Sequence, residues 1–183
     1  MSFFSRLFGG KPRARREEDR IYLTRAAKWK ALVADGDARF VAHFPATRRE
    51  FQEFSRVNGA NTSVALAREL LAPAGPDPNL RIVAIERDPL REHDERLCEW
   101  ADGAASSIVF TVSLDDALLS AFGDSLKSVI ARLGVDANEV LVNSMLSKSI
   151  AAAQEKIRKQ TGADLPADSD VAWMRSNAPS QSL

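Results

Sequence analysis

Short apolar runs, separated by longer amphipathic stretches, characterise the chain between residues 20 and 122. The runs at residues 40–44, 80–85 and 108–112 are dense in Ile, Val, Ala and Phe, which is typical of buried strands. The stretches between them have the spacing of amphipathic helices. This alternation of strands and helices favours an α/β domain with a mostly parallel sheet.

Local start and stop signals predict where the helices lie. Thr24 is a candidate N-cap of the first helix, because its hydroxyl can accept a hydrogen bond from an amide in the first turn. Ser113 and Asp116 form a capping-box pattern that is expected to open another helix after the third strand. The other helices are predicted at residues 45–58, before Gly59, and at residues 62–71 and 89–100.

The last third of the chain is expected to be helical. One apolar stripe at residues 126–133 and a long helix from residue 136 to residue 161 each end at a glycine. After residue 164 the serine, asparagine and proline content favours a flexible tail, in which only Trp173 is expected to dock. The predicted domains are a head (1–19), an α/β domain (20–122), a helical extension (123–163) and a tail (164–183).

The head combines an apolar face with a basic run. If residues 2–8 form a helical turn or two, their apolar side chains share one face. Such a head suits reversible attachment to anionic lipid, where each nearby cation adds about 1 kcal/mol. The same side chains could instead pack on a protein partner or on the chain's own core. The candidate membrane- or partner-binding residues are Phe3, Phe4, Arg6, Leu7, Phe8, Lys11, Arg13, Arg15 and Arg16.

The formal net charge of zero is a cancellation between two unlike parts. Residues 1–16 carry five basic residues and no acid, so the remainder holds 25 acids against 20 bases. This distribution predicts an anionic surface as the partner of the head and a protein as the partner of the acidic remainder. No nucleic-acid partner is expected.

Cysteine content and hydropathy narrow the class of protein. The lone Cys98 excludes an intramolecular disulfide scaffold and a zinc ribbon. No apolar run approaches the roughly 20 residues of a membrane-spanning helix, and the first residues lack the features of a secretory signal. We therefore expect a cytoplasmic chain, with peripheral contact at the inner membrane through the head.

Motifs for catalysis, metal binding or phosphate binding are not found in the sequence. It contains neither G-x-x-x-x-G-K-[ST] nor G-x-G-x-x-G, so no nucleotide cofactor is expected by those routes. His43 and His93 are 50 residues apart and are interpreted as structural or surface residues. Asp115 and Asp116 are expected to complement a helix N-terminus rather than to act as an acid–base pair. The chain is predicted not to be an enzyme.

Several ordered segments resemble the SecA preprotein translocase ATPase family, in its second nucleotide-binding domain and the start of its scaffold helix. Residues 106–123 are similar to the family's strand and following "SLEDDL...FG" helix, and residues 132–134 to its "DRLG" turn. Residues 147–156 resemble its "AIENAQRKVE" helix, while residues 21–31 and 85–87 resemble "YKTEEAKFKAIV" and "TER". The resemblance implies a RecA-like three-layer domain followed by a C-terminal helical extension.

The resemblance fails where the family binds nucleotide. Its "QLRGRAGRQGD" motif supplies arginines to the nucleotide phosphates, whereas residues 96–103 replace two of them by Cys98 and Trp100. The carboxylates of Glu99 and Asp102 in the same stretch would repel an anion. The family's first nucleotide-binding domain, with its phosphate loop, has no counterpart here. The residues of this degenerate motif are Arg96, Cys98, Glu99, Trp100 and Asp102.

The resemblance and the degenerate motif together predict a non-catalytic SecA-like module. It would be associated peripherally with the membrane and would act by protein–protein interaction, in protein export or in another membrane machine. Two alternatives remain open at this point: a subunit that completes a nucleotide site in trans, and a soluble oligomeric scaffold. The sequence leaves homo-oligomerisation undecided.

Overall fold

A computed structural model describes residues 13–73, 75, 77–120 and 139–179. The predicted helical stripe at residues 126–133 lies outside these residues, as does the predicted boundary after residue 122. The part of the head from Phe3 to Lys11 also lies outside them.

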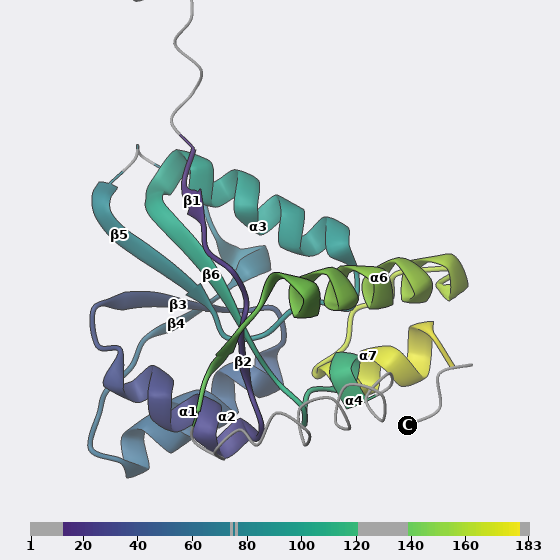
Figure 1. Ribbon diagram of the computed structural model, residues 1–183, viewed down its shortest axis with the longest axis horizontal. Coiled ribbons are helices and arrows are strands. Elements are labelled where there is room, and N and C mark those ends of the chain that lie inside the picture. The colour runs from purple at the N-terminus through teal and green to yellow at the C-terminus, as the bar shows by residue number, and fades with distance from the viewer. Residues whose placement is uncertain (1–12, 74, 76, 121–138, 180–183) are drawn as a thin grey trace, which may run out of the picture.

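The described residues form a seven-stranded, mostly parallel sheet in the order β4-β3-β5-β6-β2-β7, with β1 pairing with β6 beside β2 (Figure 1). All pairings are parallel except that of β7 with β2. The three predicted strands are confirmed and lie at its centre. The strands are β1 (Arg15–Arg16), β2 (Arg20–Tyr22), β3 (Ala38–Ala42), β4 (Val64–Leu66), β5 (Asp77–Ala84), β6 (Ala105–Ser113) and β7 (Leu141–Val142).

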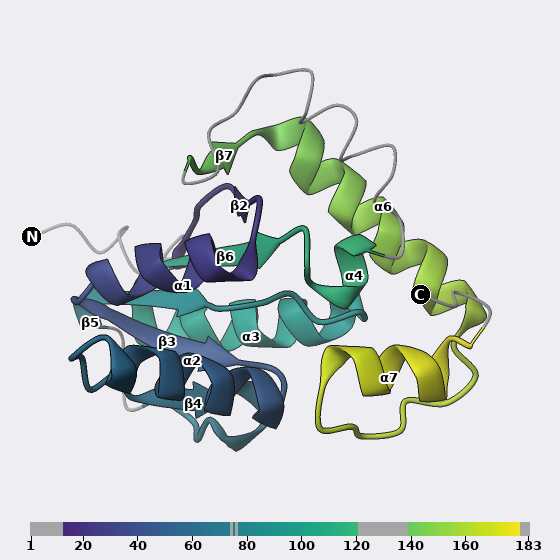
Figure 2. The ribbon, with the colours of Figure 1, turned by 90° about the horizontal axis from the view of Figure 1, so that it is seen from below.

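Helices cover both faces of the sheet, which gives the predicted three-layer α/β architecture. Helices α1 (Arg25–Ala34) and α2 (Pro45–Val57) pack on one face, and α3 (Arg91–Ala104) packs on the other (Figure 2). Neighbouring residues of β5 supply the two cores in alternation: Val83 faces α1 and α2, whereas Ile82 faces α3. Burial on both faces explains why residues 82–85, at the end of this strand, form an unbroken apolar run.

Two local helix signals of the first half are confirmed, the N-cap at Thr24 and the stop at Gly59. The Thr24 hydroxyl accepts the backbone N–H of Ala27 at 3.1 Å and caps α1. Helix α2 ends before Gly59, which has a φ of +77°, a left-handed conformation that favours glycine.

Residues 62–71 were predicted to be helical, and this prediction is wrong. Residues Val64–Leu66 form β4 beside β3, and only a single 3-10 turn, η2 (Ala67–Glu69), follows. Val64 and Leu66 are buried in the same core as β3. Pairing with the edge of β3 and burial therefore override the local helix preference.

The C-terminal part forms a second layer of helices at one end of the sheet. It contains α4 (Ala117–Ser120), α6 (Ser144–Gln160) and α7 (Asp170–Asn177), which share a core with Phe44 and Leu90. Helix α6 starts later than the predicted residue 136, because Leu141–Val142 pairs as β7 and Asn143 caps the helix.

The predicted flexible tail is also corrected by the structure. Residues 164–179 are packed on the domain, and α7 buries both Trp173 and Met174 at 1–2% exposure. The Arg49 guanidinium donates to both carboxylate oxygens of Asp168, at 3.0 and 2.6 Å. Trp173 does dock, as expected, but it belongs to a segment held at several points.

Lys28, on α1, is a fully buried cation that faces the turn after β6. Its Nζ lies 2.7 and 3.0 Å from the two carboxylate oxygens of Asp116 and 4.7 Å from the centre of the Trp29 ring. Asp116 also accepts the backbone N–H and the hydroxyl of Ser113, at 2.8 and 2.7 Å. The Asp116 carboxylate therefore makes its part of the predicted capping box with Ser113. The same carboxylate also neutralises the buried Lys28 ammonium.

We expect Asp116→Ala to lower the free energy of unfolding by about 3–5 kcal/mol, because it leaves the Lys28 ammonium buried and unpaired. Lys28→Met should cost less, since the Asp116 carboxylate keeps Ser113 and lies 3.4 Å from an Arg25 nitrogen. Urea unfolding of both single variants and the double variant measures the coupling. Strictly additive losses would contradict this assignment.

Candidate functional site

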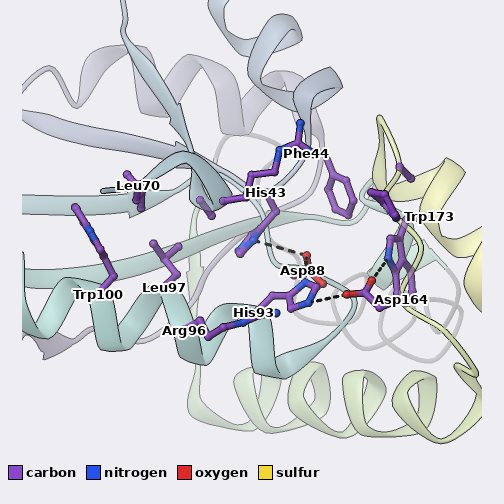
Figure 3. A pocket seen from close by; sticks show the side chains of 14 residues that line it. His43, Phe44, Leu70, Asp88, His93, Arg96, Leu97, Trp100, Asp164 and Trp173 are labelled. Atoms are coloured by element: carbon purple, nitrogen blue, oxygen red, sulfur yellow. Dashed lines mark hydrogen bonds and ion pairs between the residues drawn. The ribbon is translucent and has the colours of Figure 1, made fainter. Parts of the chain in front are cut away.

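The carboxyl ends of β3 and β5 form a crevice, because the chain leaves these adjacent strands in opposite directions. Helix α2 follows β3 on one face of the sheet, and α3 follows β5 on the other. Such a switch point is where open α/β sheets usually bind ligands. A pocket of about 430 Å³ lies there (Figure 3). Its walls come from the loops after β3 and β5, from η2 and α3, and from the segment before and within α7.

Two histidines meet at one carboxylate inside this pocket. The Nδ1 atoms of His93 and His43 lie 3.0 and 3.7 Å from the same oxygen of Asp88 (Figure 3). The Nε2 atom of His43 lies 3.0 Å from Asp94, but its N–H is not aligned for a hydrogen bond to that oxygen. The structure thus joins two residues that the sequence interpreted separately.

His43 is held as a cation. Burial of its side chain, which is 4% exposed, opposes the charge, but Asp94, Asp88 and Glu86 outweigh burial and raise the pKa of His43 to about 9. An imidazolium at neutral pH follows from this environment.

Asp94, on α3, connects the pocket to the rest of the fold. Its carboxylate accepts from the Arg87 guanidinium at 2.9 Å, the Gln154 amide at 2.7 Å and the Asp88 backbone N–H at 3.1 Å. Burial opposes ionisation, but His43, Arg87 and the Asp88 backbone N–H lower the pKa of Asp94 below its usual value. Asp94 therefore remains an anion.

Glu86 fixes the start of α2. Its carboxylate accepts the backbone N–H groups of His43 and Phe44, both at 2.8 Å, and the Thr47 hydroxyl at 2.5 Å. Burial raises the pKa of Glu86 to about 7 despite these donors. The carboxylate orients the loop that carries His43 into the pocket.

His93 links the domain to the C-terminal segment. Its Nε2 lies 3.0 Å from an Asp164 carboxylate oxygen, and the Trp173 indole donates to the other oxygen at 2.9 Å. Both ring nitrogens of His93 thus face carboxylates, an environment that favours the doubly protonated imidazolium. The hydrogen bond to Asp88 raises the pKa of His93, which favours this cationic form.

The described residues that line the pocket include no serine, threonine or cysteine. Nor do the described residues contain a group of three or more histidine, cysteine, aspartate or glutamate side chains that could hold a metal ion.

The degenerate-motif residues all lie on α3, but only Arg96 and Trp100 line the pocket. Glu99 is exposed. Burial raises the pKa of the half-buried Cys98 thiol, which lowers the fraction of reactive thiolate. The Trp100 indole donates to the Leu71 carbonyl at 2.7 Å.

The end of the predicted head belongs to the sheet. Arg15 and Arg16 form β1, and Ala14 beside them is buried. The Arg16 guanidinium donates to Asp102 at 2.6 Å and to the Cys98 carbonyl at 2.8 Å, so one predicted head residue binds the motif helix. This contact within the chain engages the Arg16 charge, while the side chain itself stays exposed. Arg13 and Arg15 remain exposed.

Among the described residues, none of the helices is both long and apolar enough to span a bilayer.

Comparison with known proteins gives consistent partial matches. The chain is 36% identical over 104 residues to the protein translocase subunit SecA of Porphyromonas gingivalis, covering 55% of this chain and 9% of that protein. It is 32% identical over 151 residues to the SecA subunit of Chlorobium phaeovibrioides, covering 81% and 14%. The chain thus spans only 9–14% of the length of these curated relatives. No known family profile matches it.

We expect the stability of the fold to fall as pH rises from about 6.5 to about 9. A group whose pKa is raised in the folded state stabilises it fully below the unfolded pKa, and this contribution is lost as pH rises through the folded pKa. For His43 the two values are 6.5 and about 9. The loss should be on the order of 1–3 kcal/mol.

Urea unfolding at several pH values between 6 and 10 measures this loss, with His43→Gln as the test variant and the parent chain as its control; His93, whose pKa is also raised, is present in both. Glu86, whose pKa is raised to about 7, adds a loss in the same direction at lower pH, between about 4.5 and about 7. His43→Gln should therefore flatten the profile above about pH 7. An unchanged slope there in His43→Gln would refute the assignment of a buried imidazolium.

Proposed function

This chain is related in sequence to the SecA protein translocase family, and from that relationship we propose that it is a non-catalytic SecA-like module. It acts by binding a protein partner in protein translocation, and it is attached peripherally to the membrane by residues 3–16. It corresponds to the family's second nucleotide-binding domain and the start of the scaffold helix.

The observation that carries this proposal is the way the motif helix α3 is bound within its own chain. Asp102, in the stretch that resembles the family's phosphate-contacting motif, accepts from the Arg16 guanidinium at 2.6 Å and from the Ala14 backbone N–H at 3.0 Å. Trp100 stands at a position of a family arginine and contacts Leu71 and Arg39, whose guanidinium carbon lies 5.5 Å from its ring centre. These positions stabilise the fold instead of facing a phosphate.

Charge supports the same interpretation. Glu99 is exposed on α3, where its carboxylate would repel a nucleotide triphosphate. The acidic surplus of residues 17–183 favours a protein partner, and the basic surplus of residues 1–16 favours an anionic membrane surface.

We expect Mg²⁺ and ATP at about 5 mM to leave the melting temperature of the chain unchanged, because the proposed module does not bind nucleotide. A ligand that binds the folded state would raise the melting temperature. The measurement is a thermal-shift titration, with a SecA protein as the positive control. A dose-dependent rise in melting temperature would favour the rival function, in which the chain completes a nucleotide site in trans.

We expect the chain to float with inner-membrane vesicles more strongly than with protein-free anionic vesicles. Protease treatment of the vesicles should reduce flotation to the lipid-only level, because the protein partner is lost. The lipid-only binding should weaken at about 0.5 M salt, since the Debye length shortens. Replacing Phe3, Phe4 and Phe8 by serine should abolish it.

A matched control replaces three exposed apolar residues elsewhere by serine: Val57, Leu71 and Met145, which are 69%, 84% and 73% exposed. This variant should float with protein-free vesicles like the parent chain. Equal flotation of the parent chain with intact and protease-treated vesicles would argue against a protein partner and for lipid binding alone. Failure to float with any vesicle would leave the soluble scaffold as the function.

A further inference from the structure

The pocket at the carboxyl ends of β3 and β5 has the size and lining of a small-molecule site. Its volume of about 430 Å³ falls within the range of ligand pockets. Apolar side chains from several elements form most of its wall: Phe44 after β3, Leu70 after η2, Leu97 and Trp100 on α3, and Trp173 on α7. Figure 3 shows Leu70, Leu97 and Trp100 on one side of the two histidines and Phe44 and Trp173 on the other. Such a lining favours a ligand with a flat apolar body.

The charged side chains of the pocket have a surplus of positive charge. His43, His93, Arg68 and Arg96 line it together with only two carboxylates. Those carboxylates, Asp88 and Asp164, are already engaged by the histidines. The surplus therefore resides on the two arginines.

Arg68 and Arg96 are both exposed, and within the described part of the chain neither forms an ion pair. The Arg96 side chain donates only to the Glu92 backbone carbonyl, at 3.3 Å. Most other described arginines are paired with carboxylates, as Arg49 is with Asp168. Two free guanidinium forks beside one pocket are suited to an anionic group.

We propose that this pocket binds a small organic anion that carries one carboxylate on an apolar, aromatic body. The carboxylate lies at Arg68 and Arg96, and the body lies between Trp100, Leu97 and Trp173. A cation would meet carboxylates that are already neutralised, whereas a polyphosphate would bring several charges close to Asp88 and Asp164. A single negative charge is attracted by the two arginines without this repulsion.

The probe for the test is 1-naphthaleneacetate, and its neutral control is 1-naphthaleneacetamide, which has the same shape. The three tryptophans of the chain report on binding by ¹H–¹⁵N NMR. The indole N–H groups of Trp100 and Trp173 should shift, whereas that of Trp29, in the core under α1 and α2, should not. The acid should bind about five- to tenfold more tightly than the amide, because a charge-assisted hydrogen bond to arginine replaces a neutral one.

Arg68→Met and Arg96→Met should each weaken binding of the acid about five- to tenfold and leave the amide unchanged. Arg175→Met is the matched control: Arg175 is exposed on α7, but it does not line the pocket. Equal affinities of acid and amide would overturn the proposal, as would unchanged affinity in both pocket variants. Shifts confined to Trp29, or no shift at about 10 mM probe, would overturn it as well.

Discussion

The buried carboxylate of Asp94 is the interaction on which the arrangement of the pocket depends. It accepts hydrogen bonds from Arg87, in the loop after β5, and from Gln154, on α6. It also lies beside His43, in the loop after β3. Arg87 in turn donates to Asp19, which precedes β2. A buried charge must be paired, so the sheet and the helical extension meet here in one arrangement.

The elements with strong local signals could be predicted from the sequence. Residues 40–42 and 82–85 are apolar on both faces, as burial between two helical layers requires, and Thr24 makes the capping contact that its position suggests. Residues 62–71 could not be predicted locally, because their conformation is set by pairing with β3. The local helix or strand preference of a segment decides its secondary structure only where tertiary contacts do not oppose that preference.

The candidate site was predicted only in part. Arg96 and Trp100 were singled out through a resemblance, and they line the pocket. His43 and His93 were not expected to meet, since nothing in their sequence spacing shows that β3 and β5 are neighbours. A usable signal exists nonetheless: His43 follows one apolar run, Asp88 follows the next, and parallel strands bring such residues to one edge.

The docking of residues 164–179 has a consequence for how the protein is made. Synthesis proceeds from the N-terminus, so the segment that carries Asp164 and Trp173 leaves the ribosome after all other parts of the pocket. Until then Phe44 lacks its partners from α7, and His93 lacks Asp164. The sheet can form early, but the pocket is completed only after residues 164–173 have left the ribosome.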